Sequence, residues 1–238
     1  QYLPCLARTL AVRRASSGMV NSIGVTVRSL RSMRYASGRR ALCSPATVCS
    51  PTRLSLLTGR HSFRFDGGGR VFVGIGGPCT IPEDRLTLPE MLRSRGYATA
   101  IVGKWHCGMS FSDADGNVID RKAHEDVKGL ARVELVDFSR RIAGGPVDHG
   151  FDSFFGTACC PTTDTLYSYI VGDRIPNPPT KRKDADALPQ HFYSLDCRAG
   201  LQSDDFDLEM VDMVFLEKSQ AFMREHVAEH PKQPFFLY

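Results

Sequence analysis

The chain has 238 residues, of which 42% are hydrophobic and 24% charged, a composition that suits one globular domain or a large part of one. No uninterrupted apolar run reaches the roughly 18 residues of a transmembrane helix, so we expect no membrane partner. The net charge of +4 is unevenly spread, because residues 1–65 contain eleven Arg but no Lys, Asp or Glu, whereas the rest is acidic.

Residues 1–42 are rich in Arg and Ser, and three interpretations compete for them. They resemble an organelle transit peptide, they suit a basic arm for nucleic acid or another polyanion, or they are non-native sequence, as a frameshift would produce. We favour the third, because Arg occurs without Lys, periodicity is weak, and no strand pattern leads into the following motif. The functional domain is therefore expected over residues 43–238.

Residues 49–60 read CSPTRLSLLTGR and predict a short helix. Ser50 is expected as its N-cap, Pro51 suits the first helical position, and Gly59 suits the residue past its end. Cys49 then lies at a helix start, where free backbone N–H groups favour an anion. Arg53 follows about one turn later on the same face.

A second pattern predicts an α/β unit. Thr87 and Glu90 form a capping box for a helix that should run to about Arg95 and stop at Gly96, and residues 97–102 read as a short apolar strand. Helix, glycine and strand in this order are typical of an α/β sheet.

Lys104 and His106 follow the predicted strand, where sites form in parallel sheets. If the chain stays extended, their side chains point to the same side and Trp105 packs the opposite way. Lys104 would then bind the oxygens of an anion, and His106 would assist proton transfer. The simpler alternative is a surface lysine and a hydrogen-bonded structural histidine.

The remaining elements are less specific. Residues 113–117 tempt a calcium-loop interpretation, but the glycine falls at position 4 instead of 6, so we predict a turn. Residues 208–226 predict an amphipathic helix, and residues 235–238 (FFLY) predict a buried strand. Because the chain starts with Gln1 and stops within this strand, we expect the domain to be incomplete at both ends.

The two motifs resemble signatures of the type I sulfatases. The first is C-x-P-x-R followed by L-T-G-R at residues 49–60, and the second is GYATAIVGKWH at residues 96–106; HGFDSFFG at 149–156 resembles a segment that often follows. The resemblance implies an alkaline-phosphatase-like α/β fold, a three-layer sandwich with a mostly parallel central sheet.

The resemblance also implies an arylsulfatase-like sulfuric ester hydrolase. Cys49 would be oxidised to formylglycine by a formylglycine-generating enzyme that reads Pro51 and Arg53. Cys49, Arg53, Lys104 and His106 would be catalytic, with Lys104 and His106 also binding substrate. The expected partner is a sulfate-ester small molecule or a sulfated carbohydrate, without nucleic acid. Family habit implies an extracytoplasmic location, whether periplasmic, secreted or lysosomal.

The family binds a divalent cation, usually Ca²⁺, and here the resemblance is incomplete. Cys49, as formylglycine, would be one ligand, but the carboxylate pair expected ahead of it is missing, since no Asp or Glu precedes Asp66. The other expected ligands lie further along than this chain extends. We therefore expect this chain to be inactive or nearly so.

Three alternatives stay open. A phosphonate or phosphodiester hydrolase would use the same modified cysteine. A non-catalytic anion-binding remnant would keep Arg53, Lys104 and His106 as a sulfate pocket. A nucleic-acid binder would use residues 1–42, with salt-dependent binding as its mark.

Overall fold

A computed structural model describes residues 46–69, 71, 75, 77–120, 126–161, 164–184 and 197–238. The interpretation of residues 1–42 as non-native sequence lies outside this range. Within the described residues, none of the helices combines the length and apolarity needed to cross a membrane.

A four-stranded sheet with the order β4-β2-β1-β7 forms the centre of the molecule. Strand β1 (Ala98–Lys104) pairs in parallel with β2 (Ser153–Thr157) on one side and with β7 (Phe235–Leu237) on the other, and β2 pairs antiparallel with β4 (Ile170–Val171). The predicted mostly parallel sheet is confirmed, and both predicted strands belong to it.

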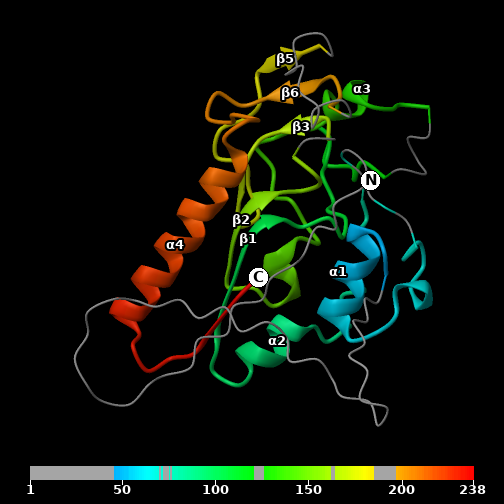
Figure 1. Ribbon diagram of the computed structural model, residues 1–238. Coiled ribbons are helices and arrows are strands. Elements are labelled where there is room, and N and C mark those ends of the chain that lie inside the picture. Colours follow the sequence, from blue (N-terminus) through cyan, green and yellow to red (C-terminus); the bar gives the residue numbers. More distant parts are fainter. Residues whose placement is uncertain are drawn as a thin grey trace.

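Helices cover both faces of this sheet. The long helix α4 (Val211–Glu229) runs along one face, and α1 (Cys49–Thr58) and α2 (Leu88–Arg93) lie on the other (Figure 1). The predicted three-layer α/β architecture is therefore confirmed. Two short 3₁₀ helices are also present: η1 (Ser62–Arg64) follows α1, and η2 (Pro146–His149) precedes β2.

A second, three-stranded sheet was not predicted. Its order is β3-β6-β5, from β3 (Leu166–Tyr167), β6 (Gly200–Gln202) and β5 (Lys181–Lys183), with β3 parallel and β5 antiparallel to β6. It lies at one end of the molecule with α3 (Leu130–Val133) beside it (Figure 1). Strands of two or three residues are too short for a clear alternating pattern, which explains the omission.

The residues at the helix ends agree in part with the predicted capping residues. Helix α1 begins at Cys49, and its N-cap is the extended residue Val48 with no side-chain cap, so the prediction of Ser50 as N-cap is wrong. Gly59 ends α1 in the left-handed region at φ 62°, as predicted. The capping box of α2 is present, although this helix ends at Arg93, two residues earlier than expected.

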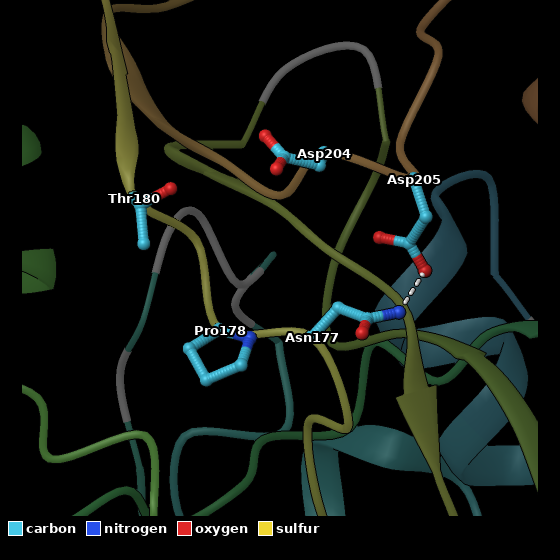
Figure 2. A pocket seen from close by; sticks show the side chains of 5 residues that line it. All are labelled: Asn177, Pro178, Thr180, Asp204 and Asp205. Carbon is cyan, nitrogen blue, oxygen red and sulfur yellow. Dashed lines mark hydrogen bonds between the residues drawn. The ribbon is translucent and has the colours of Figure 1, made fainter.

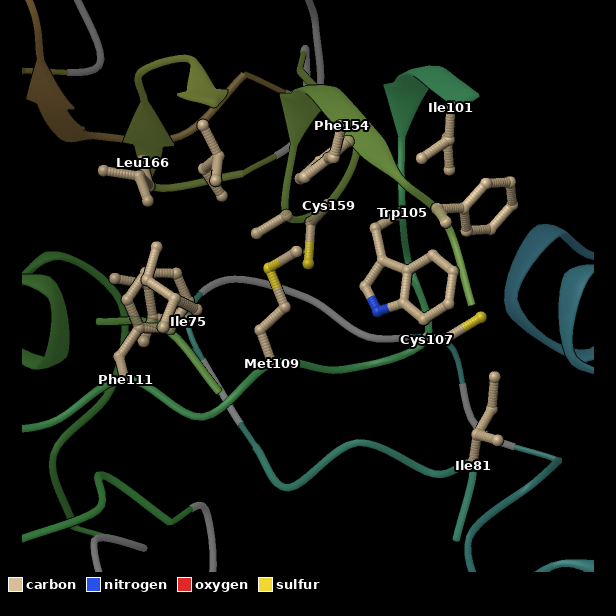
Figure 3. Close-up of a cluster of buried hydrophobic side chains, with 14 of the residues drawn as sticks. Ile75, Ile81, Ile101, Trp105, Cys107, Met109, Phe111, Phe154, Cys159 and Leu166 are labelled. Carbon is tan, nitrogen blue, oxygen red and sulfur yellow. The ribbon is translucent and has the colours of Figure 1, made fainter. Parts of the chain in front are cut away.

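The main hydrophobic core lies against the central sheet (Figure 3). Trp105 is fully buried there, with the Phe151 ring edge-on at 6.5 Å between centroids. Phe151 in turn stacks on Phe236 of β7 at 6.1 Å. These aromatic contacts are of the kind that add to simple area burial, and they join the chain after β1 to both neighbouring strands.

The absence of a side chain at Gly156 allows β1 and β2 to approach closely. Gly103 and Gly156 are register partners, and a Cβ added to Gly156 would lie 1.7 Å from the carbonyl oxygen of Gly103. The obstacle is backbone in the middle of the sheet, so it has no rotamer by which to move away.

We predict that Gly156→Ala lowers the free energy of unfolding by about 3 kcal/mol or more, because the added methyl forces the two central strands apart. Urea unfolding followed by circular dichroism measures this change. Gly69→Ala is the matched control, since a Cβ there meets nothing within 4 Å. Equal stability of the two variants would contradict the prediction.

Candidate active site

The two sequence motifs meet where the N-terminal half of α1 faces the end of β1. Nη1 of Arg53 donates a hydrogen bond of 2.5 Å to the carbonyl oxygen of Lys104, a residue 51 positions away in the chain. The guanidinium also lies over the ring of Tyr238, with Cζ 5.4 Å from the ring centroid. Cys49, the first residue of α1, is half-buried one turn before Arg53. This hydrogen bond joins the two motifs.

Parallel pairing continues beyond the end of β1. The amide of Trp105 donates to the carbonyl of Thr157 at 2.9 Å, and the amide of His106 donates to the carbonyl of Ala158 at 2.9 Å. The segment after β2 therefore runs alongside Lys104 and His106. Its Cys160 accepts a hydrogen bond from Nζ of Lys104 at a donor–acceptor distance of 3.5 Å.

The extended geometry expected for residues 104–106 is wrong at His106. Its φ is +60°, so the backbone turns there, and the two-residue alternation that would align it with Lys104 does not apply. His106 is 2% exposed, whereas Lys104 is half-buried. Trp105 packs into the core as expected, and its Nε1 donates to the carbonyl of Gly108 at 2.8 Å.

A buried thiol lies within electrostatic reach of Cys49 and Arg53. Burial raises the pKa of Cys107 well above 9.0; the neighbouring thiols of Cys79 and Cys49 raise it further, while the Arg53 guanidinium opposes this. Burial also raises the pKa of Cys79 to about 12. Both thiols therefore stay protonated near neutral pH, and Cys49 itself is half-buried at the start of α1.

A carboxylic acid is buried just beyond the segment that follows β2. Burial raises the pKa of Asp164 to about 6, opposed by hydrogen bonds from the Thr165 amide and the Cys159 thiol. The Thr165 amide donates to Oδ1 at 2.7 Å, while Oδ2 is buried without a partner. Burial likewise raises the pKa of Cys159, with Asp164 adding to the effect.

His149 has a packing role. Its ring stacks on Trp105 with centroids 6.0 Å apart, and the residue is 3% exposed. Burial lowers its pKa below 6.5, against the opposing effect of Asp148, so the ring is neutral near pH 7.

The expected calcium site is not formed by the residues that the structure describes. Among them, no group of three or more His, Cys, Asp or Glu side chains is placed to hold a metal ion. Residues 113–117 form the turn that the sequence predicts in place of a calcium loop, and the Asn117 amide donates to the Asp113 carboxylate at 2.8 Å. The donor set therefore does not fit the cation that the family resemblance implies.

An open pocket elsewhere has the wrong charge for a sulfate. Figure 2 shows it lined by Asn177, Pro178, Thr180, Asp204 and Asp205, with the Asn177 amide bonded to the Asp205 carboxylate at 2.8 Å. Two carboxylates repel an anion, so the junction of α1 and β1 remains the better site.

Sequence reasoning missed two side chains of this junction, Cys160 and Tyr238. A signal existed for Cys160, because strands that pair in parallel end at the same edge of a sheet, and Thr157 is the register partner of Lys104. Pairing partners are not readable from one sequence, however. Tyr238 was recognised only as part of a strand pattern.

Comparison with known proteins agrees with the resemblance of the two motifs to sulfatase signatures. A family model described as Sulfatase matches residues 40–238. Arylsulfatase D of Homo sapiens is 32% identical over 123 residues, 50% of this chain and 16% of that protein. N-acetylgalactosamine-6-sulfatase of Sus scrofa is 28% identical over 202 residues, 80% of this chain and 29% of that protein. The aligned parts thus cover less than a third of either relative.

The fold is also found among solved structures. One from Bacteroides thetaiotaomicron, described under the metabolism of multiple glycosaminoglycans, superposes with a TM-score of 0.55 at 19% identity. The superposition covers 80% of this chain and 40% of that one, and at this identity it supports the fold alone.

The raised pKa of the buried Asp164 carboxyl predicts that the stability of the fold depends on pH. Because its folded pKa of about 6 lies above its ordinary 3.8, the folded state holds the proton more tightly than the unfolded state. Asp164 therefore destabilises the fold as pH rises from 3.8 to 6, and the loss is complete above 6.

Asp164→Asn removes this penalty and keeps an acceptor for the Thr165 amide. We predict that its stability advantage over wild type grows by about 2 kcal/mol between pH 4.5 and 7.5. Urea unfolding of both proteins at both pH values measures the change, with the exposed Asp66→Asn as control for the lost charge. An advantage that does not vary with pH would contradict the prediction.

Proposed function

The chain belongs to the sulfatase family, and we propose that it forms the N-terminal part of a catalytic domain that hydrolyses sulfate esters. The observation that carries this proposal is the hydrogen bond from Arg53 to the carbonyl of Lys104, which unites the two motifs at one end of β1. The two relatives named as sulfatases support the same family as the two motifs.

Hydrolysis of a sulfate ester needs a strong nucleophile, positive charge around the sulfuryl oxygens, and a proton for the leaving group. Cys49 would supply the nucleophile after oxidation to formylglycine, whose hydrate attacks sulfur with one hydroxyl and helps to expel sulfate with the other. Its half-buried position at the start of α1 suits this role, since the helix N-terminus favours an anion.

The neighbouring side chains divide the remaining tasks. The Lys104 ammonium would bind the sulfuryl oxygens, and the Arg53 guanidinium adds positive charge while tying α1 to β1. His106 would assist proton transfer beside the modified Cys49. Arg53 and Lys104 bring positive charge to one place, and neither takes part in the ion pairs found among the described residues.

Relatives suggest the substrate class. N-acetylgalactosamine-6-sulfatase is named for a sulfated sugar, and its similarity extends over 80% of this chain. We therefore propose a sulfated carbohydrate as substrate, with an aryl sulfate as the practical test compound. The further partner would be a formylglycine-generating enzyme that reads Pro51 and Arg53, and the location would be extracytoplasmic, as in the family.

The missing cation site favours a second candidate function for the 238 residues by themselves. With no metal cluster among the described residues, and no carboxylate ahead of Asp66, the repulsion between sulfate and nucleophile lacks its usual offset. Losing such an electrostatic partner raises the barrier by several kcal/mol. The chain alone would then bind a sulfated ligand without turning it over.

We predict no measurable hydrolysis of 4-nitrophenyl sulfate by the purified 238-residue chain in the presence of calcium. Release of nitrophenol, followed by absorbance, is the measurement, and mass spectrometry of the Cys49 peptide shows whether formylglycine is present. Parallel assays with a phosphonate and a phosphodiester separate the related hydrolase class. Clear turnover of the sulfate ester would contradict the prediction of inactivity.

We also predict that the chain binds inorganic sulfate and that Lys104→Met weakens this binding at least tenfold, because the ammonium is the charge nearest the expected anion. Trp105, the only tryptophan of the chain, adjoins Lys104 and provides a fluorescence signal for the titration. Constant ionic strength with chloride and the exposed control Lys181→Met exclude nonspecific charge effects. Equal affinity of wild type and Lys104→Met would refute this assignment.

A further inference from the structure

The adjacent cysteines at the end of β2 lie in different surroundings. Cys159 is 4% exposed, and its sulfur points into the core towards Met109 (Figure 3). Cys160 is half-buried, and its sulfur lies 3.5 Å from Nζ of Lys104. The Cys159 thiol therefore belongs to the core, and the Cys160 thiol belongs to the proposed anion site.

The backbone determines where Cys160 lies relative to Lys104. Thr157 and Lys104 are register partners, and the pairing continues through the bond from the His106 amide to the Ala158 carbonyl. Arg53 holds the carbonyl of Lys104 from the other side. The start of the lysine side chain is thus held on both sides, and only its flexible tip remains to be oriented.

Cys160 is the group that orients this tip. A lysine side chain has high rotamer entropy, so an ammonium needs a partner to stay in one place. Among the described residues, the hydrogen bond found for Nζ of Lys104 goes to Cys160, and none of the described ion pairs includes Lys104. A weak sulfur acceptor suits this purpose, because it directs the ammonium while leaving its positive charge available to an anion.

We propose that Cys160 is a positioning residue whose sulfur holds the Lys104 ammonium at the anion site, and that covalent modification of this thiol by a soft electrophile weakens anion binding. The inference rests on the proposed function, because it takes Lys104 as the anion-binding group. It adds a modification site outside the two sequence motifs.

Accessibility separates Cys160 from Cys107 and Cys159, which are buried, whereas Cys49 and Cys79 are half-buried like Cys160. Burial raises the pKa values of Cys79, Cys107 and Cys159, so these three thiols stay protonated near neutral pH. With iodoacetamide, the Cys160 sulfur forms a bond to the methylene carbon, the carbon–iodine bond breaks, iodide leaves with the electron pair, and the thiol proton goes to solvent. The thioether that results is bulkier than the thiol and displaces the ammonium.

The test is sulfate titration of the full 238-residue chain with a conservative rescue. Cys160→Ala removes the acceptor, and we expect a three- to tenfold weaker affinity for inorganic sulfate. Cys160→Ser keeps an acceptor of similar size and should bind within twofold of wild type. Cys197→Ala removes a half-buried thiol that packs against the cluster of Tyr167, Tyr169, Phe206 and Val211, and should leave affinity unchanged. Unchanged thermal midpoints show that the variants fold.

Alkylation provides the second measurement. We expect sulfate to slow the modification of Cys160 by iodoacetamide, followed by peptide mass spectrometry, and Lys104→Met to abolish this protection. Modified wild type should bind sulfate as weakly as Cys160→Ala or more weakly.

The outcomes separate this inference from the proposed function. Normal sulfate affinity in Cys160→Ala, combined with loss in Lys104→Met, overturns the positioning role and leaves the anion site standing. Equal weakening in Cys160→Ser and Cys160→Ala overturns the acceptor role in the same way. Failure of the wild-type chain to bind sulfate overturns both the anion site and the role of Cys160.

Discussion

The parallel pairing of β1 with β2 is the constraint on which the rest of the structure depends. It is close because Gly156 has no side chain to meet the backbone of Gly103, and it continues past both strand ends to His106 and Ala158. This extension determines where Lys104, Trp105 and His106 lie, and it carries Cys160 to the lysine. A distortion between the two glycines would therefore reach the proposed site as well as the sheet.

Much of the second motif, residues 96–106, stabilises the pairing of β1 with β2 and takes no part in the proposed chemistry. Thr99 donates from its amide and its hydroxyl to the Asp152 carboxylate at 2.8 and 2.9 Å, which joins the start of β1 to the start of β2. Trp105 fills the core between His149 and Phe151. The residues between Thr99 and Lys104 are mostly buried, as expected for a central strand. Residues of a functional signature can thus be needed for the geometry that presents a few reactive groups.

Electrostatics at the junction of α1 and β1 favour an anion over a metal ion. Arg53 and Lys104 bring positive charge to the end of the sheet, and burial keeps the nearby thiols of Cys79 and Cys107 protonated. Asp204 and Asp205 lie elsewhere, in the open pocket, whereas Asp164 is buried beside Cys159. For these 238 residues we therefore propose the binding of an oxyanion, and under that proposal catalysis would require groups that the described part of the chain does not bring to this place.

The sequence by itself determined the local elements and the family. The capping box of Thr87 and Glu90, the terminating Gly59 and the apolar strand patterns act over a few residues, so they are readable without a fold. Only the tertiary structure decided that Arg53 bonds to Lys104, that the backbone turns at His106, and that Cys160 meets the lysine. These contacts join residues about 50 positions apart through strand register and helix docking, and such long-range pairing leaves no periodic signal in a single sequence.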